Sequence, residues 1–70
     1  MAGLGAAFRS NLARAMQAHP DKQWVICQRA GYNPGYVRRV VIGAKPNPTL
    51  YFVECMAAAL GVDPLELLKD

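Results

Sequence analysis

Cysteine and histidine are scarce in this chain, which has two cysteines and one histidine among its 70 residues. Cys27 and Cys55 are widely separated, and neither a Cys-x-x-Cys nor a His-x-x-x-His spacing occurs. Because a tetrahedral zinc site needs four ligands, usually at such spacings, we expect no metal site. A disulfide framework is not expected, since each cysteine falls inside a predicted helix. Both thiols are predicted to be core or half-buried side chains.

Groups that could act together in catalysis are also missing. His19 is predicted to lie in a loop beside Pro20, without a nucleophile or a pair of carboxylates near it. General acid and base catalysis requires such groups within hydrogen-bonding reach of one another. We therefore expect no enzymatic activity, no cofactor and no small-molecule substrate.

Long apolar runs are absent, and none approaches the roughly 18 residues that a membrane-spanning helix needs. A basic leader would carry lysine or arginine, and the first seven residues carry neither. We therefore expect a cytoplasmic protein that does not enter the membrane. Residues 1–7 are rich in glycine and alanine and are expected to be flexible, so that residues 8–70 form the single domain.

Acidic residues are few, five against eight lysines and arginines, which gives a net charge of +3. Hydrophobic residues make up 53% of the chain and charged residues 19%, so we expect a folded domain rather than a disordered segment. The positive charge suits a polyanionic partner but does not identify one. A core this small is marginal unless the helices are well capped or the protein dimerises.

Glycines, prolines and short polar side chains mark the expected helix boundaries. Three glycines, each after a helical pattern, predict helix ends in the left-handed conformation: Gly31, Gly43 and Gly61. Four residues are expected to cap helix starts: Asp21, Asn33, Thr49 and Asp63. Proline follows Asn33 and Asp63, and Glu66 completes a pattern close to a capping box. The sequence thus predicts an all-α fold, a compact bundle of five helices over residues 4–18, 22–30, 34–42, 50–60 and 64–68.

Residues 23–43 contain two short amphipathic helical patterns joined at Gly31. A helix-turn-helix unit needs a small residue where the helices cross, a residue of positive φ at the turn, and apolar residues that fix the second helix. Cys27, Gly31, and Val37 with Val40 fill these places. This spacing is typical of a unit that binds DNA.

The second helix of this unit separates apolar from basic side chains. At about 100° per residue, the three valines 37, 40 and 41 fall on one side, and Gly35, Arg38, Arg39 and Ile42 fall on the other. An exposed arginine can form a pair of hydrogen bonds to guanine in the major groove. The alternative is that two surface arginines merely solvate a helix.

Taken together, these motifs resemble the lambda-repressor-like helix-turn-helix family, which includes phage repressors, Cro proteins and the xenobiotic-response-element group. The resemblance covers about residues 8–68, and the joint spacing of its motifs is more specific than any one of them. The matching residues are Gln23, Ile26-Cys27, Ala30-Gly31, Val37, Val40, Gly43, Pro48-Thr49-Leu50, Val53, Met56-Ala57 and residues 59–64. It implies a transcriptional regulator, phage repressor-like or Cro-like, that binds double-stranded DNA as a homodimer on near-palindromic operators. It also implies a bacterial cytosol or nucleoid location and a phage or prophage origin.

The resemblance also implies which residues contact DNA, with the helix of residues 34–42 inserted into the major groove. Phosphate contacts are expected from Gln23, Asn33, Lys45 and Asn47. Base contacts are expected on the surface formed by Pro34, Gly35, Tyr36, Arg38 and Arg39. Because proline and glycine lack hydrogen-bonding side chains, base recognition would fall to the two arginines and the tyrosine.

Two features depart from the family pattern. Many members pair an arginine of the first helix with a glutamate late in the third; Arg14 matches the former place, but Val41 occupies the latter. Hydrophobic residues also occur where the family is usually polar: Trp24, Tyr51, Phe52 and Cys55. An exposed aromatic patch suggests a partner, and we expect a homodimer contact that uses Tyr51, Phe52 and Leu65. The alternative is that these aromatic side chains close over the core.

A different class of function stays open from the sequence alone. The same helical bundle could be a protein-interaction module, antitoxin-like or an adaptor, with weak or no DNA binding. Such a module would use Trp24, Tyr51 and Phe52 to hold another protein.

Overall fold

The computed structural model describes residues 4–44 and 48–69, and these form five helices and no strand. The helices are α1 (Leu4–Ala18), α2 (Gln23–Ala30), α3 (Pro34–Val41), α4 (Leu50–Leu60) and α5 (Pro64–Leu68). The all-α prediction is therefore confirmed, with α2 beginning and α3 ending one residue inside the expected bounds. Of the segment 1–7 that we expected to be flexible, residues 1–3 lie outside the described part, and α1 already begins at Leu4. No described helix is both long and apolar enough to cross a membrane.

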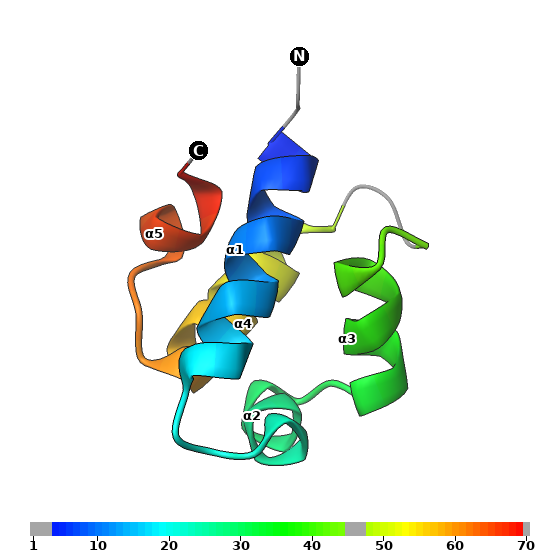
Figure 1. The fold of residues 1–70 in the computed structure, drawn as a ribbon, viewed down its shortest axis with the longest axis vertical. Helices are drawn as coiled ribbons and strands as arrows, with labels where there is room; N and C mark the ends of the chain where they lie inside the picture. Colours follow the sequence, from blue (N-terminus) through cyan, green and yellow to red (C-terminus); the bar gives the residue numbers. More distant parts are fainter. Residues whose placement is uncertain (1–3, 45–47, 70) are drawn as a thin grey trace.

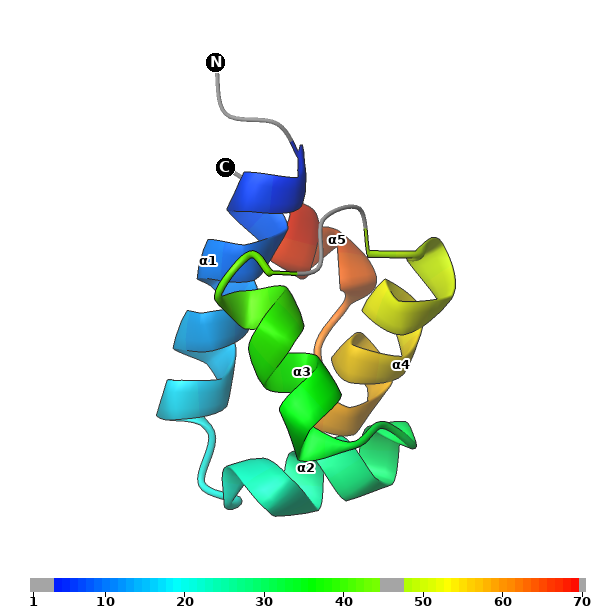
Figure 2. The same cartoon turned by 90° about the vertical axis from the view of Figure 1, so that its right-hand side faces the viewer.

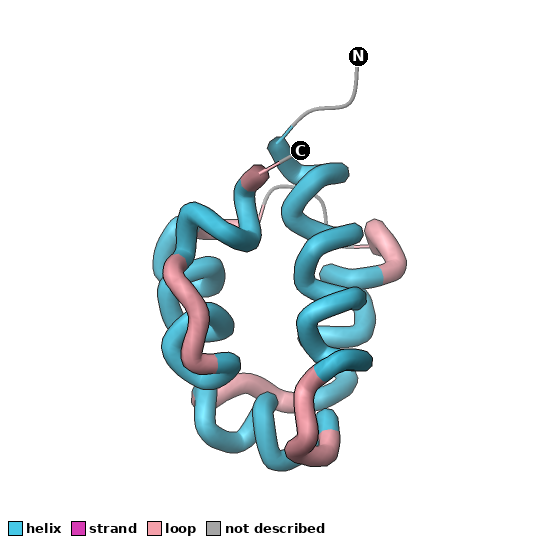
Figure 3. Tube along the Cα trace, turned by 60° about the vertical axis from the view of Figure 1, so that its left-hand side comes forward, coloured by secondary structure: helices cyan, strands magenta, loops and turns pink. Residues whose placement is uncertain are grey.

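Two helices, α1 and α4, occupy the middle of the molecule, and the others surround them (Figure 1). Helix α2 packs against α4 at one end, and α5 packs against α1 and α4. Helix α3 packs against α1 and α2, on the side of the molecule away from α5 (Figures 1 and 2). Short loops connect most of the helices (Figure 3). This arrangement leaves α3 on the outside of the bundle.

One hydrophobic core joins all five helices. Its buried residues are Phe8, Leu12, Met16, Ile26, Cys27, Val37, Val40, Phe52, Val53, Met56, Ala57, Ala59, Leu60 and Leu67. The rings of Phe8 and Phe52 meet edge to face, with centroids 6.0 Å apart. Phe52 is fully buried, and burying such a side chain contributes about 1.5–3 kcal/mol. The expectation that Phe52 is exposed was wrong, because its face of α4 turns toward the core.

The helix ends follow the sequence signals with two exceptions. Gly31, Gly43 and Gly61 all have positive φ. The side chains of Asn33, Thr49 and Asp63 each accept a hydrogen bond from a backbone N–H of the first turn of α3, α4 and α5. Asp21 does not cap α2, because that helix begins after Lys22 and the Asp21 carboxylate accepts a hydrogen bond from Arg29 instead. Glu66 likewise pairs with Lys69 rather than completing a capping box.

Two long-range hydrogen-bonding side chains close the ends of helices, and neither was predicted. Arg29 donates to the carbonyl of Ala59, 2.7 Å away, in the last turn of α4. Asn11 of α1 donates to the carbonyl of Leu67, 3.0 Å away, and also to that of Lys69. Carbonyls in the last turn of a helix have no partner within the helix, so these side chains satisfy groups that would otherwise depend on water.

Candidate nucleic-acid interface

The turn between α2 and α3 is closed by backbone hydrogen bonds. Gly31 has a φ of 84°, which a glycine adopts without steric cost. Its N–H donates to the carbonyl of Gln28, and the N–H of Tyr32 donates to that of Cys27, at 3.1 and 3.0 Å. This pair of bonds is the Schellman arrangement that ends a helix. The helix-turn-helix geometry that the spacing predicted is therefore present.

The start of α3 is fixed by its cap. The Asn33 Oδ1 accepts a hydrogen bond from the N–H of Gly35 at 2.7 Å, so only the side-chain amide Nδ2 of Asn33 remains for the phosphate contact that we expected of it. A Cβ at position 35 would lie 3.0 Å from the same Oδ1. Glycine at this place therefore protects the cap as well as allowing close approach of another molecule.

The outer face of α3 carries two arginines. The inner face is fixed by Val37 and Val40, which are almost completely buried, and Arg38 and Arg39 are exposed. No other helix covers the outer side of α3 (Figure 2). Within residues 4–44 and 48–69, the carboxylates pair with Arg29 and Lys69 but not with these two arginines. Both guanidinium groups are therefore open to an external partner.

Tyr36 lies at the edge of the basic face of α3, three residues before Arg39. Its ring stacks on that of Tyr32 at 5.4 Å and meets Phe52 at 5.6 Å, toward α4. The side chain is half-buried. These aromatic contacts hold the ring against the flank of the bundle, and the base contact expected of Tyr36 stays a prediction.

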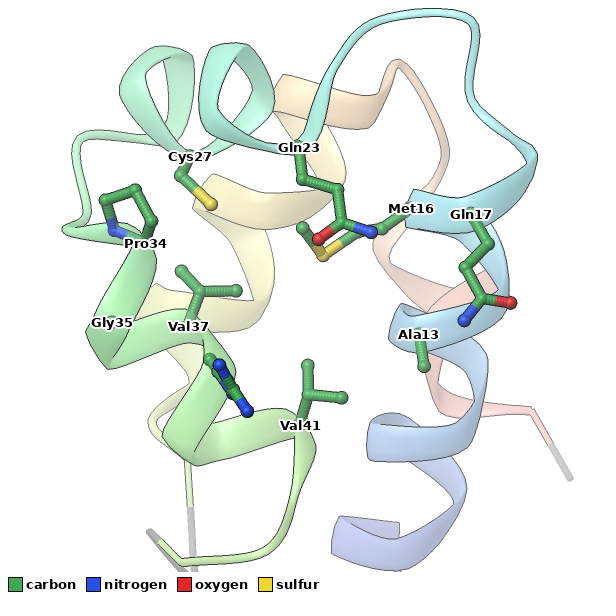
Figure 4. A pocket seen from close by; sticks show the side chains of 10 residues that line it. Ala13, Met16, Gln17, Gln23, Cys27, Pro34, Gly35, Val37 and Val41 are labelled. Carbon is green, nitrogen blue, oxygen red and sulfur yellow. The ribbon is translucent and has the colours of Figure 1, made fainter.

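The start of α2 is not closed by a side chain. Lys22 occupies the N-cap position and makes no side-chain hydrogen bond to the helix. Gln23, the first helical residue, is exposed, and its side chain points into the space that α1, α2 and α3 enclose (Figure 4). Backbone N–H groups at an open helix start can bind an anion. The phosphate contact that the resemblance implies for Gln23 stays a prediction.

A pocket of about 520 Å³ lies between α1, α2 and α3. Val41 forms one wall, and the α1 residues opposite are Ala13, Met16 and Gln17 (Figure 4). Arg14, which we matched to the arginine of the family's ion pair, does not line this space; it is exposed and donates a hydrogen bond to Asn11. The match between Arg14 and that position was therefore wrong.

Other basic and polar candidates lie beyond the end of α3. Lys45 and Asn47, both expected to contact phosphate, lie outside the described residues. Arg9 of α1 is half-buried, and its guanidinium lies alongside Gly43, 3.5 Å from where a Cβ of that residue would be. Arg9 is therefore a further cation at the end of α3, and its distance from Gly43 in sequence hid this placement.

The three residues expected at a dimer contact differ in their exposure to solvent. Tyr51 and Leu65 are 68% and 65% exposed, whereas Phe52 is fully buried. A hydrogen bond with Cys55 and the proximity of this thiol raise the pKa of Tyr51, and burial raises that of Tyr32. Tyr51 thus belongs to a cluster with Cys55 and Tyr32 beside the turn of the helix-turn-helix.

The two thiols differ in environment. Cys27 is buried between α2 and the core, and burial raises the pKa of its thiol. Cys55 is half-buried, and neither cysteine forms a disulfide. His19, as expected for a structural loop residue, accepts a hydrogen bond from the N–H of Asp21 at 3.1 Å.

Of the comparisons with known proteins, the one with solved structures found a match for this fold. No protein-family model matches the sequence, and no curated protein matches it. The solved structure of the restriction-modification controller protein C.AhdI from Aeromonas hydrophila is similar, with a TM-score of 0.79 and 27% sequence identity. The match covers 90% of this chain and 94% of that one. Almost the whole helical bundle is therefore shared between the two chains.

Proposed function

The chain has the lambda-repressor-like helix-turn-helix fold, and on this basis we propose that it is a sequence-specific DNA-binding transcriptional regulator. The observation that carries the proposal is the outer face of α3, where Arg38 and Arg39 are exposed without carboxylate partners in the described part of the chain. Buried Val37 and Val40 hold this face in place. A helix that is fixed from behind and basic in front suits the major groove.

Within this proposal, base recognition falls mainly to Arg39, with Arg38 beside it. Arginine forms two parallel hydrogen bonds to guanine O6 and N7, and each such pair discriminates by about 1–3 kcal/mol. Gly35 and Pro34 offer only backbone and apolar surface, so they would allow close approach rather than specify a base. Tyr36 borders this surface, and its ring packs toward α4.

Phosphate contacts would position α3 in the groove. Gln23 at the uncapped start of α2 and the free amide of Asn33 are the described candidates, and Lys45 and Asn47 are proposed from the resemblance alone. Such contacts supply affinity without sequence preference. If each subunit makes about three to five of them, the affinity should fall by orders of magnitude between low and moderate salt.

We also propose that the protein binds a near-palindromic operator as a homodimer. Tyr51 and Leu65 remain candidates for the contact because they are large, apolar and exposed. Sedimentation of the free protein across concentrations, and again with bound DNA, tests this: a monomer under all these conditions would eliminate the dimer.

The regulatory role can be proposed at a finer level in two ways. The sequence resemblance suggests a phage repressor-like or Cro-like protein, and the structural neighbour is a controller of restriction and modification. The match over 94% of that controller's chain favours considering the second role beside the first. Mapping the sites selected from a random DNA pool onto the genome of the source would separate them, since the two roles place operators before different genes.

Titration with duplex DNA tests the proposal against the alternative of a protein-interaction module. A labelled random-sequence duplex at low salt should bind, and its affinity should fall steeply as salt is added. Selection from a random pool should then yield a sequence that binds more tightly than the starting pool by about 10³-fold or more. Salt-independent or absent binding would favour an interaction module, for which Trp24, 57% exposed, would be the first contact to test.

A further inference from the structure

The pocket between α1, α2 and α3 has the size and composition of a small-molecule binding site. Its volume of about 520 Å³ falls in the range of about 300–1,000 Å³ that is usual for small-molecule sites. The floor is formed by apolar side chains, the almost completely buried Met16 and Val37 and the half-buried Val41. Three polar side chains complete the lining: Gln17, Gln23 and Arg38. An apolar floor with a few convergent polar groups is the usual composition of a ligand site.

The charge of the lining selects the kind of ligand. Arg38 is its one charged member, and none of the described residues that line the pocket is acidic. The side chains of Gln17, Gln23 and Arg38 make no hydrogen bond to the described part of the chain. A guanidinium binds a carboxylate through two parallel hydrogen bonds, and the amide groups can add further donors. An inorganic anion would leave the apolar floor in contact with water, whereas an organic anion would cover it.

We propose that this pocket binds a small organic carboxylate with a compact apolar body, the carboxylate on Arg38 and the body against Met16 and Val41. Four of the lining residues, Gln23, Pro34, Gly35 and Arg38, also belong to the proposed DNA surface. A bound ligand would therefore compete with DNA for the same side chains. The competition rests on the proposed function, but the site itself does not.

The site is tested by nuclear magnetic resonance titration of the whole chain with 2-naphthoate and with uncharged 2-naphthamide. Because hydrogen bonds to charged groups are stronger than neutral ones, 2-naphthoate should bind about tenfold or more tightly than the amide. Its shifts should be saturable and centred on Ala13, Met16 and Val41. Equal binding of the two probes, or shifts centred on Tyr51 and Leu65, would overturn the proposal. So would equal competition by inorganic phosphate, which would indicate a phosphate contact only.

Matched variants separate the pocket from the rest of the surface. Ala13→Leu places a larger side chain in the pocket and should abolish binding of both probes, whereas Ala58→Leu on the exposed side of α4 should leave binding unchanged. Circular dichroism shows whether each variant is folded, and Arg38→Gln should remove the preference for 2-naphthoate even if Ala13→Leu does not fold. Unchanged binding in Ala13→Leu, or an unchanged preference in Arg38→Gln, would contradict the site.

The effect on DNA is measured separately. With random-sequence duplex at low salt, saturating 2-naphthoate should weaken DNA binding by the wild type and by Ala58→Leu, but not by Ala13→Leu. If 2-naphthoate fills the pocket and DNA affinity does not change, the competition is wrong while the site stands. If the protein binds no DNA at all, the proposed function fails, and the two-probe titration still decides the site.

Discussion

Arg29 connects three parts of the fold, and its removal should lower the free energy of unfolding. One guanidinium nitrogen donates to the carbonyl of Ala59 at 2.7 Å, and another to the carboxylate of Asp21 at 2.9 Å. The first bond joins α2 to the last turn of α4; the second joins α2 to the loop that precedes it. A positive charge also interacts favourably with the carbonyl end of α4.

The two bonds should contribute unequally. A hydrogen bond from a charged donor contributes about 1.5–3 kcal/mol, and its loss leaves the Ala59 carbonyl without its partner. The pair with Asp21 is solvent-exposed, at 47% and 41% of the two side chains, and such pairs contribute only about 0.2–1 kcal/mol. Arg29→Ala should therefore lower the free energy of unfolding by about 2 kcal/mol, and Asp21→Asn by less than about 1 kcal/mol.

Urea unfolding followed by circular dichroism measures both values, and thermal unfolding checks them. In a domain of this size, each 1 kcal/mol lowers the Tm by about 4–8 °C. Arg29→Lys should be intermediate, because a lysine has one nitrogen and cannot reproduce two bonds from separate nitrogens. Two results would contradict these unequal contributions. One is an equal loss of unfolding free energy in Asp21→Asn and Arg29→Ala, and the other is a loss below about 0.5 kcal/mol in Arg29→Ala.

Three further predictions concern binding, packing and reactivity. Arg39→Ala should weaken binding to the selected operator by about 1–3 kcal/mol and relax the preference at one base pair, whereas Gln23→Ala should weaken binding to all sequences alike. Competition with single-base variants of the operator distinguishes the two effects. A uniform loss of affinity in both variants would contradict the proposed roles. Leu12→Ala, at a fully buried position, should cost about 2–5 kcal/mol in urea unfolding, and a cost below 1 kcal/mol would be inconsistent with a central place in the core. Cys55 should react with a thiol reagent in the native state, and Cys27 on the order of 100-fold more slowly because it reacts only on opening; equal rates would rule this out.

Helix α3, which we propose faces DNA, was predictable because its determinants are local. The valines at 37 and 40, the cap at Asn33 and the stop at Gly31 act through residues three or four positions apart, so that helix periodicity alone fixes which side is apolar. The burial of Phe52 was predictable in the same way. It shares a face of α4 with the buried Met56 and Ala59 at i+4 and i+7, whereas its hydrophobic neighbour Tyr51 lies off this face and is exposed.

Longer-range contacts carry no such signal in the sequence. The bond from Arg29 spans 30 residues to Ala59, and that from Asn11 spans 56 residues to Leu67. A second bond from Arg29 engages the carboxylate of Asp21, whose place in the sequence favoured a capping role instead. Helix periodicity predicts that the arginines of α3 are exposed. The orientation of the Tyr36 ring depends instead on its contacts with Tyr32 and α4.

The amino-acid sequence by itself determined the five helices, their ends and the basic face of α3, because helix propensity, capping and periodicity operate within one or two turns. Only the tertiary structure decided the pocket between α1, α2 and α3 and the closing of α4 and α5 by distant side chains. These features depend on how helices pack across the core, and packing is set by the shape of all the side chains together. The chemistry at the surface follows from both.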